Sequence, residues 1–394
     1  MGPAAVPLTI APRPTERQRL TAEVKRLAVI HGLTIARVAS AEPFAWLEPV
    51  LDAHIAAGRV AGLDWFTPQR ARESTDPRTL LPTVRALLAV GLAYHLPDPP
   101  RPDDGVPRGR IARYARGLDY HRLMRSRMEA FVAALRDELG RPIEARMLSD
   151  TARIVDRAVS ARAGLGWYGK HSCLIVPGHG SWVVLGEVLL DIDLEPDAPL
   201  ERDCGRCRIC LDQCPTGAIV EPYAVDAPRC LSFQTIEQRG AIPPDIRPLM
   251  GDWVFGCDVC QEACPYAGAA REAADPAFAP RTLDNAFPAL PWLLAMTEAE
   301  FRETYRGTPV LRAKRRGLAR NAAVALGNLG DPDRALPPLL AALADHDEPL
   351  VRAHAAWAVG RHDVTGARRA LERAWRDDPD DAVRDEAATA LSFG

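Results

Sequence analysis

Eight of the nine cysteines lie between residues 204 and 264, and their spacing fits iron-sulfur chemistry. The first run is Cys204-x2-Cys207-x2-Cys210-x3-Cys214, followed by Pro215. In bacterial ferredoxins this run places three thiolates on one [4Fe-4S] cluster, while the fourth, before the proline, ligates the other cluster of a pair. The sequence must therefore supply a second run.

The second run is Cys257-x2-Cys260-x3-Cys264-Pro, and it lacks its first cysteine because Val254 stands in that place. Cys230 is the only nearby thiol that could substitute. Eight thiolates are enough for two clusters. We expect one cluster on Cys204, Cys207, Cys210 and Cys264, and the other on Cys214, Cys230, Cys257 and Cys260.

Two four-cysteine zinc sites are the alternative, because such sites commonly use two CxxC pairs. Zinc needs neither the third cysteine at x2 spacing nor the two Cys-Pro endings, so an electron-transferring cluster pair is the better interpretation. An odd total of nine cysteines, eight of them in one short block, also differs from a secreted disulfide framework and indicates a reducing compartment. Cys173 lies outside the block, where a buried apolar thiol is more common than a ligand.

Two other strings resemble cofactor motifs, and their context argues against both. GLGWYG at 164–169 spells the dinucleotide fingerprint, but a helix is expected before it and a strand after it, the reverse of a phosphate-binding turn. Asp52-Ala-His54 approximates a cobalamin motif that places a histidine under cobalt, yet its glycine comes one residue late. We expect His54 to be an ordinary helical residue.

Asp150 stands just before an expected helix, and two roles are open for it. On residue type alone it is a helix N-cap, with Asp156 and Arg157 forming a solvated charged pair one turn later. A catalytic role as a general acid would need apolar surroundings that keep the carboxyl group protonated. The local sequence does not supply that.

A basic collar precedes the last third of the chain. It contains no acidic residue, whereas residues 321–394 hold 8 basic and 13 acidic side chains. Such a cluster can contact a phosphate backbone, and a solvated helix start is the alternative. The collar consists of Arg312, Lys314, Arg315, Arg316 and Arg320.

The elements around these residues predict a mixed α+β protein. Strand-like apolar runs are expected at 86–94, 172–176 and 181–191, and helices at 15–33, 120–139 and 154–163. Toward the C-terminus, AAVALG (322–327) recurs as AAWAVG (355–360) at an offset of 33 residues, which is typical of stacked helical repeats. We divide the chain into an α/β domain at 1–195, a ferredoxin-like domain at 196–270, a connector at 271–306 and HEAT-like repeats at 307–394.

Length and charge limit the partners. The 394 residues carry a net charge of −3, so a nucleic acid would have to meet a local basic patch. No apolar run has the length of a membrane helix. The N-terminus lacks the basic and long apolar regions of a signal peptide, so a cytoplasmic location is expected.

Taken together, these strings resemble the epoxyqueuosine reductase family from about Leu20 to the end. The similarity is carried by DYH (119–121), Asp150 with AGLGWYGKHS (163–172), CGRCRICLDQCPTGAI (204–219), RCLSFQTIEQRGAIP (229–243), GCDVCQEACP (256–265) and RNAAVALGN (320–328). The order and spacing of the strings make the resemblance specific. A ferredoxin run alone would not identify the family.

The resemblance implies reduction of the epoxide of epoxyqueuosine to queuosine, at the wobble position of tRNA. An external donor would supply electrons to two [4Fe-4S] clusters. The clusters would in turn reduce cobalamin, which would be bound base-off over the 1–195 domain. The cobalt would act as nucleophile or reductant, Asp150 would be the general acid, and the repeats and collar would grip the anticodon stem-loop. A monomer is expected. The implied cobalamin contacts are Asp150, Lys170, His171, Cys173, Leu174, Leu185, Ser232, Cys257 and Asp258.

Some residues depart from the family pattern. Ser74 stands near a position where family members often carry a cobalamin-binding arginine, with Arg70, Arg72 and Arg78 around it. Two other classes compete with this interpretation. A reductive dehalogenase would typically carry an export signal and no RNA-binding repeat, and a non-catalytic electron-transfer module would bind clusters without cobalamin.

Overall fold

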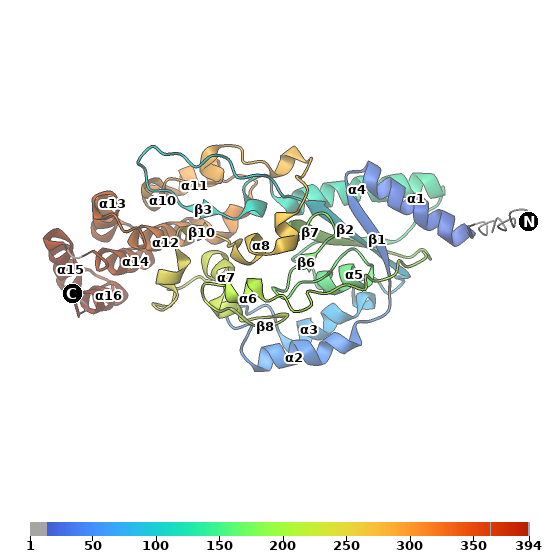
Figure 1. Cartoon of the computed structure of the whole chain (residues 1–394), viewed down its shortest axis with the longest axis horizontal. Helices are drawn as coiled ribbons and strands as arrows, with labels where there is room; N and C mark the ends of the chain where they lie inside the picture. The colour runs from blue at the N-terminus through green and yellow to red at the C-terminus, as the bar shows by residue number, and fades with distance from the viewer. Residues whose placement is uncertain (1–13, 363, 393–394) are drawn as a thin grey trace, which may run out of the picture.

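The computed structural model describes residues 14–362 and 364–392. The molecule is elongated, with a sheet domain near the N-terminus and stacked helices at the C-terminal end, as Figure 1 shows. Residues 1–13, on which the prediction about a signal peptide depends, lie outside the described residues. In the described part of the chain, no helix is both long and apolar enough to cross a membrane.

The N-terminal domain is built on a four-stranded antiparallel sheet in the order β1-β2-β7-β4. The strands expected at 86–94 and 181–191 are its two central strands, whereas the strand expected at 172–176 begins only at Leu174 and continues to a bridge at Val176. The strands are β1 (Ile35–Ser40), β2 (Ala86–Ala93), β4 (Ala145–Leu148) and β7 (Val183–Leu190), with a separate ribbon of β5 (Trp167–Tyr168) and β6 (Leu174–Ile175).

Helices cover both faces of this sheet, so its central strands are apolar on both sides. Leu88 and Val90 of β2 pack under two helices, while Leu87 and Ala89 face the opposite layer. One face is covered by α1 (Glu16–Ile30) and α4 (Tyr120–Leu139), and α5 (Asp156–Arg162) packs on the other. The helices α2 (Glu48–Ala56) and α3 (Pro68–Thr75) contact each other on the same side of the molecule as α5 (Figure 1).

The helix α4 has the predicted limits, because both of its ends carry strong signals. The Asp119 carboxylate accepts the His121 N–H at 3.0 Å as an N-cap. At the other end Gly140 adopts a left-handed φ of 58°, which ends the helix at little steric cost. His54 lies within α2, as expected, and the turn 164–169 has a helix before it and a strand after it.

The cysteine-rich segment has little regular structure, which is typical of a fold organised by bound clusters. Its short elements are α6 (Ile209–Asp212), β8 (Ile219–Glu221), β9 (Ala224–Val225), α7 (Leu231–Ile236), β10 (Trp253–Phe255), α8 (Val259–Glu262) and α9 (Pro265–Gly268). β10 pairs in parallel with β3 (Arg110–Ile111), which joins this segment to the N-terminal part of the chain.

The C-terminal helices form two stacked layers. The inner layer is α12, α14 and α16, and α13 and α15 pack outside it. The repeated glycines permit close stacking, since a Cβ at Gly327 would lie 2.7 Å from the Ala358 Cβ, and one at Gly360 would lie 2.6 Å from the Ala390 Cβ. The helices are α10 (Leu290–Ala295), α11 (Glu298–Thr304), α12 (Lys314–Gly327), α13 (Pro332–Asp345), α14 (Pro349–Val359), α15 (Thr365–Asp377) and α16 (Asp381–Ser392).

The helix α12 is buried on every side along 317–327. Arg320 is fully buried and donates to the carbonyl oxygens of Gln234, Gln238 and Gly240 at 2.7–2.8 Å. The prediction that Arg320 belongs to the tRNA-contacting collar is therefore wrong, because its guanidinium satisfies buried carbonyls of the cysteine-rich segment and is closed to a phosphate.

Candidate functional site

Asp150 is the centre of a hydrogen-bonded group of four side chains. Its Oδ2 accepts the Tyr120 hydroxyl at 2.8 Å and lies 3.1 Å from His121 Nε2. The other ring nitrogen of His121, Nδ1, lies 2.8 Å from an oxygen of Asp119. A histidine held between two carboxylates, one of which is half-exposed, is an arrangement that stores and transfers a proton.

Two elements position this group. The N-cap of α4 sets Asp119, Tyr120 and His121 in consecutive positions, and the end of β4 leads into the Asp150 loop (residues 149–155). Asp150 has a left-handed φ of 46°, a strained conformation for a residue with a side chain. It is not a helix cap, since α5 begins after Val155 without a side-chain cap.

The charges in this group differ from the sequence-based expectation of a carboxyl group kept protonated by apolar surroundings. The Asp150 side chain is 57% exposed. Desolvation opposes its ionisation, but the hydrogen bonds from His121 and Tyr120 hold the pKa of Asp150 below its ordinary value. Desolvation likewise opposes a charge on His121, yet the two carboxylates raise the pKa of its ring to about 9. The proton therefore resides on His121, between two carboxylates.

The helix α3 holds the Asp150 loop from outside. Arg70 Nη2 donates to the Thr151 carbonyl at 3.0 Å, and its guanidinium lies 4.8 Å from the ring centre of the exposed Trp65. Arg153 of the loop pairs with Glu73 of α3 at 2.8 Å. Several of these loop contacts come from residues far apart in sequence, and no local pattern predicted them.

Ser74, with Arg70, Arg72 and Arg78 around it, stands near a position where family members often carry a cobalamin-binding arginine. Ser74 is buried, and its hydroxyl donates to the Arg70 carbonyl at 2.7 Å, which is an intrahelical contact. Arg78 pairs with Asp76 at 2.9 Å. In the described residues, the α3 arginine with a contact to the site is Arg70, through the Asp150 loop.

Asp156 does not form the expected solvated pair with Arg157. Its carboxyl group contacts that of Glu187 on β7, which is fully buried, and neither Glu187 oxygen has an ordinary donor among the described residues. Burial, and then the neighbouring carboxylate, raise the pKa of Glu187 well above its usual value. Two carboxyl groups in contact must share a proton, so this pair is a neutralised acid couple beside the sheet.

The structure brings four cysteines of the sequence-predicted first set to one small cavity. Its lining includes Cys204, Cys207, Cys210 and Cys264. The four come from two loops about fifty residues apart, each held by a single helical turn, α6 or α8.

The other four cysteines lie deeper. Cys214, Cys230 and Cys257 are close enough for a charge on one to affect the others, and Cys257 and Cys230 affect Cys260. Backbone N–H groups of Ser232 and Phe233 point at the Cys230 sulfur. All nine cysteines are free thiols.

The two metal interpretations differ in how far apart the thiols must lie. Thiolates around a single zinc ion sit about 2.3 Å from it, which brings the sulfurs together. A cubane holds its ligands farther apart, around the rim of a cavity. Four thiols that line one small cavity are compatible with such a cluster.

The residues named as cobalamin contacts divide between two places. Lys170 and His171 line the first thiol cavity, and the Lys170 ammonium donates to the Gly205 and Cys207 carbonyls at 2.6 and 2.8 Å. Both side chains therefore contact the first cysteine run, and their expected contact with cobalamin stays a prediction. Leu174 and Leu185 pack in one apolar cluster beside β7.

Ser172 and Cys173 lie near both α5 and the second thiol set. Ser172 has a φ of 66° and a buried hydroxyl without a hydrogen-bond partner in the described residues. Arg157 donates to the Ser172 carbonyl at 2.6 Å, and a charge on Cys173 affects Cys260. Leu185 is half-buried. An unpartnered hydroxyl beside apolar side chains fits the amide-rimmed face of cobalamin.

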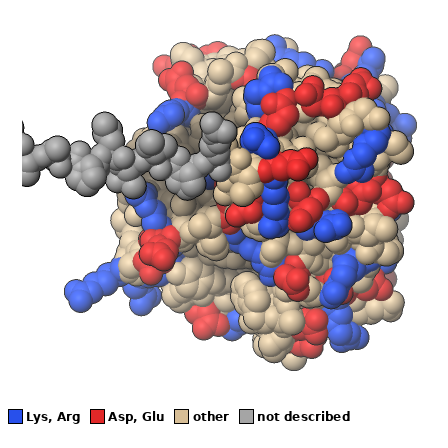
Figure 2. All heavy atoms as spheres, turned by 90° about the vertical axis from the view of Figure 1, so that its right-hand side faces the viewer, with Lys and Arg blue, Asp and Glu red and all other residues tan. Residues whose placement is uncertain are grey.

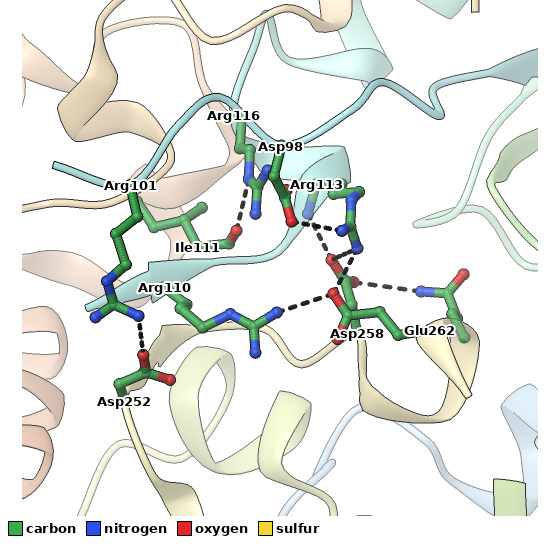
Figure 3. A network of polar contacts seen from close by, with 10 residues as sticks. Asp98, Arg101, Arg110, Ile111, Arg113, Arg116, Asp252, Asp258 and Glu262 are labelled. Atoms are coloured by element: carbon green, nitrogen blue, oxygen red, sulfur yellow. Dashed lines mark hydrogen bonds and ion pairs between the residues drawn. The ribbon is translucent and has the colours of Figure 1, made fainter. Parts of the chain in front are cut away.

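Asp258 is fully buried, and its carboxylate belongs to a charged network next to the second thiol set. Figure 3 shows Arg113 among Asp98, Asp258 and Glu262, and the Arg113 N–H donates to Asp258 at 2.8 Å. Burial raises the pKa of Asp258 to about 6, against the pull of Arg113. The side chain thus anchors the Cys257–Cys260 turn to the loop after β3, and its backbone alone could face a cofactor.

The remaining collar residues differ in how accessible their charges are to an RNA phosphate. Arg312 pairs with Glu237, and its charge reaches Asp150. Arg315 is largely buried and pairs with Asp347 at 2.5 Å. Lys314 and Arg316 are exposed. At the N-terminal end of the molecule, Figure 2 shows acidic and basic side chains mixed, without a basic patch.

Sequence reasoning from residue types did not single out Glu187, Arg70 or the His121–Asp119 pair. The DYH string at 119–121 carried a signal, an N-cap aspartate two residues before a histidine. Nothing local in the sequence linked it to Asp150, thirty residues later.

Comparison with known families identifies three parts of the chain. Residues 75–151 match a family model described as epoxyqueuosine reductase QueG. Residues 203–267 match a 4Fe-4S double cluster binding domain, and residues 308–392 match HEAT repeats.

The similarity extends over most of the chain. It is 40% identical over 318 residues to the epoxyqueuosine reductase of Xanthomonas campestris pv. campestris, covering 80% of this chain and 88% of that protein. Identity to the Escherichia coli K12 epoxyqueuosine reductase is 38% over 327 residues, covering 80% and 82%. A crystal structure of epoxyqueuosine reductase with an epoxyqueuosine-modified tRNA-Tyr stem loop superposes with a TM-score of 0.87 at 31% identity, covering 95% of this chain and 98% of that one. The chain belongs to the epoxyqueuosine reductase family.

Proposed function

We propose that this protein reduces epoxyqueuosine in tRNA to queuosine, and the observation that carries the proposal is family similarity over four fifths of the chain. The site geometry supports it. Removing the epoxide oxygen as water takes two electrons and two protons, and the chain offers a proton-storing group beside two sets of four thiols.

The proton-transfer steps belong to the four residues around Asp150. Asp119 holds His121 as an imidazolium, and His121 passes its proton to Asp150. Asp150, oriented by the Tyr120 hydroxyl, delivers that proton to the opening epoxide oxygen. A neutral acid therefore forms at Asp150 only as the proton passes, which the half-exposed carboxylate permits.

Two redox cofactors complete the proposal. The thiol sets would ligate two [4Fe-4S] clusters, with Cys204, Cys207, Cys210 and Cys264 in one and Cys214, Cys230, Cys257 and Cys260 in the other. Base-off cobalamin, when bound, supplies a low-potential centre for reduction at the epoxide carbon. Cys173, Leu174, Leu185, Ser232 and the Cys257–Asp258 backbone would hold it, with Asp150 opposite.

The anticodon stem-loop would meet the exposed part of the collar. Arg312 lies in the turn just before α12, close enough for its charge to reach Asp150, and Lys314 and Arg316 follow in the first turn of α12. Phosphate contacts there would position the wobble nucleotide over the carboxylate. We further propose a cytoplasmic monomer that takes its electrons from an external carrier.

The test is conversion of epoxyqueuosine-containing tRNA by anaerobically reconstituted protein, with and without cobalamin, followed by mass analysis of the nucleosides. We expect loss of one oxygen only with cobalamin present. Asp150→Asn should keep iron and cobalamin loading and lose turnover. If fully loaded wild-type protein gives no conversion, the function is wrong, and the electron-transfer and dehalogenase interpretations take its place.

A further inference from the structure

The two thiol sets differ in their distance from solvent. The second set lies among buried residues at 231, 233–236 and 253–256. The loop of the first run is open, since Gly205, Arg206 and Arg208 are exposed between and beside its cysteines. Because electron tunnelling weakens steeply with distance, an incoming electron has its shortest route through the first set.

Three exposed apolar side chains surround this opening. Ile209 is 42% exposed, and Tyr223 and Tyr266 are each 45% exposed. Ile209 and Tyr266 line the cavity of the first thiol set. Large apolar side chains gathered in this way are typical of an interface centre, in which tyrosine is enriched.

Backbone and side-chain contacts make these residues one surface. The Tyr223 N–H donates to the Lys170 carbonyl at 3.0 Å, and the Lys170 ammonium donates to the Gly205 and Cys207 carbonyls. On the other side, Tyr266 meets the Trp167 ring edge-on at 5.1 Å. The surface is therefore built on the same contacts that fix the first cysteine run.

Arginines form the rim of this surface. Arg202 lies 5.9 Å from the Trp167 ring centre, and within the described chain neither Arg202 nor Arg206 has an ion-pair partner. Arg208 reaches Asp212 only at 3.9 Å.

Acidic side chains lie beside these arginines. Asp203 accepts the Gly205 N–H at 2.6 Å, Glu221 pairs with Arg59 at 2.7 Å, and Glu201 and Asp212 are exposed. Within the described chain Arg202 and Arg206 form no ion pair, so their guanidinium groups are available to carboxylates of a partner. Arginines around an aromatic centre are suited to steering and holding an acidic protein.

We propose that this surface, made of Arg202, Arg206, Arg208, Ile209, Tyr223 and Tyr266, is the docking site of a small acidic one-electron carrier protein. The carrier loses one electron and the first cluster gains it, so two encounters supply the two electrons of one turnover. This inference rests on the proposed function only in assuming a cluster at the first thiol set.

The test measures cluster reduction directly, without tRNA. Cluster-loaded full-length protein is mixed anaerobically with flavodoxin hydroquinone, and bleaching of the cluster absorbance is followed by stopped flow across a salt series. We expect Arg202→Glu/Arg206→Glu/Arg208→Glu to lower the second-order rate constant at least tenfold at low salt and to flatten its salt dependence. Reduction by dithionite, a small molecule, should keep its wild-type rate.

A matched variant and a neutral substitution complete the design. Arg19→Glu/Arg141→Glu/Arg146→Glu changes the net charge equally at exposed positions of the N-terminal domain and should leave the carrier rate within about twofold. Tyr223→Ala should slow the carrier reaction several-fold without changing its salt dependence.

Three outcomes would overturn the docking site: a wild-type carrier rate in the triple variant, an equal slowing in the matched variant, or slowing that extends to dithionite. Failure of the proposed function would give a different result. The carrier would still reduce the wild-type clusters, but epoxyqueuosine in tRNA would stay unchanged.

Discussion

At the level of single residues, the site depends on which group holds the proton. His121 lies between Asp119 and Asp150, and this arrangement raises the pKa of the imidazole to about 9 and lowers that of Asp150. A protonated histidine next to an ionised aspartate presents the same total charge as a neutral pair, but it keeps the proton available at neutral pH. The acid function therefore belongs to the pair.

This arrangement predicts a specific pH dependence. Below about pH 9 the ring is protonated and supplies the acid, and above that value the proton is lost, so the single-turnover rate should fall as pH rises through about 9. His121→Gln removes the proton store and should lower the rate at pH 7.5 by 10²-fold or more. The check is single-turnover kinetics with preloaded protein from pH 6 to 10, and an unchanged alkaline limb in His121→Gln would contradict the assignment.

The buried carboxyl pair makes a second prediction at this scale. Folding raises the pKa of Glu187 well above its usual value. It also raises the pKa of Asp156, to about 6. Raised pKa values of acids favour the folded state at low pH, and that stability is lost as pH rises through the folded-state values. Glu187→Gln supplies a neutral donor to Asp156 and should remove this loss, on the order of 1–3 kcal/mol between pH 5 and 8. Thermal unfolding across that range tests it, and parallel curves for the two proteins would argue against a shared proton.

At the level of elements, α3 acts on the Asp150 loop without touching substrate. Arg70 donates to the Thr151 carbonyl, and Glu73 pairs with Arg153. The strained φ of Asp150 needs such support, because surrounding contacts must hold a left-handed aspartate in place. Arg70 is thus a positioning residue.

Arg70→Gln should lower kcat by about three- to tenfold and leave KM for tRNA unchanged, since a displaced acid affects chemistry more than binding. Arg72→Gln is the control, because Arg72 is an exposed arginine on the same helix. Cobalamin affinity, measured by absorbance titration, should be the same in both variants. A loss of cobalamin affinity in Arg70→Gln alone would show that this arginine contacts the cofactor instead.

The elements also show how far sequence reasoning extends. Local signals fixed α4, because an N-cap aspartate and a left-handed glycine bound its apolar stripe, and the ferredoxin spacing led to the two thiol sets. The pairing of β4 with β7, which brings the Asp150 loop beside Glu187, depends on contacts across forty residues and leaves no local pattern. The contact of Lys170 and His171 with the first cysteine run could not be predicted for the same reason, since only the fold shows which cysteine loop they meet.

At the level of the whole molecule, RNA binding must come from a limited part of the surface. Arg320 is buried and Arg315 is tied to Asp347, so Lys314 and Arg316 are the exposed collar residues without an ion pair in the described chain. Their neighbour Arg312 is shared with Glu237.

Lys314→Glu/Arg316→Glu should therefore weaken tRNA binding at least tenfold at low salt and lower the slope of log K against log salt by about 1–2. Filter binding or fluorescence anisotropy across a salt series measures both quantities. Arg368→Glu/Arg373→Glu on α15 is the control with two reversed charges. Equal effects in the two variants would place the RNA elsewhere.

The burial of α12 has a consequence for how such a protein can evolve. Asn321 of α12 donates to the carbonyls of Thr235 and Val254, so the first repeat helix completes hydrogen bonds of the cluster-binding segment. A recombination event that exchanged the array at residue 307 would remove those partners and leave buried carbonyls without donors. The later helices are tied to the same segment, since His354 of α14 accepts the Ile242 N–H at 3.1 Å and Glu386 of α16 pairs with the buried Arg247 at 2.7 Å. The repeats and the redox half should therefore be inherited as one unit.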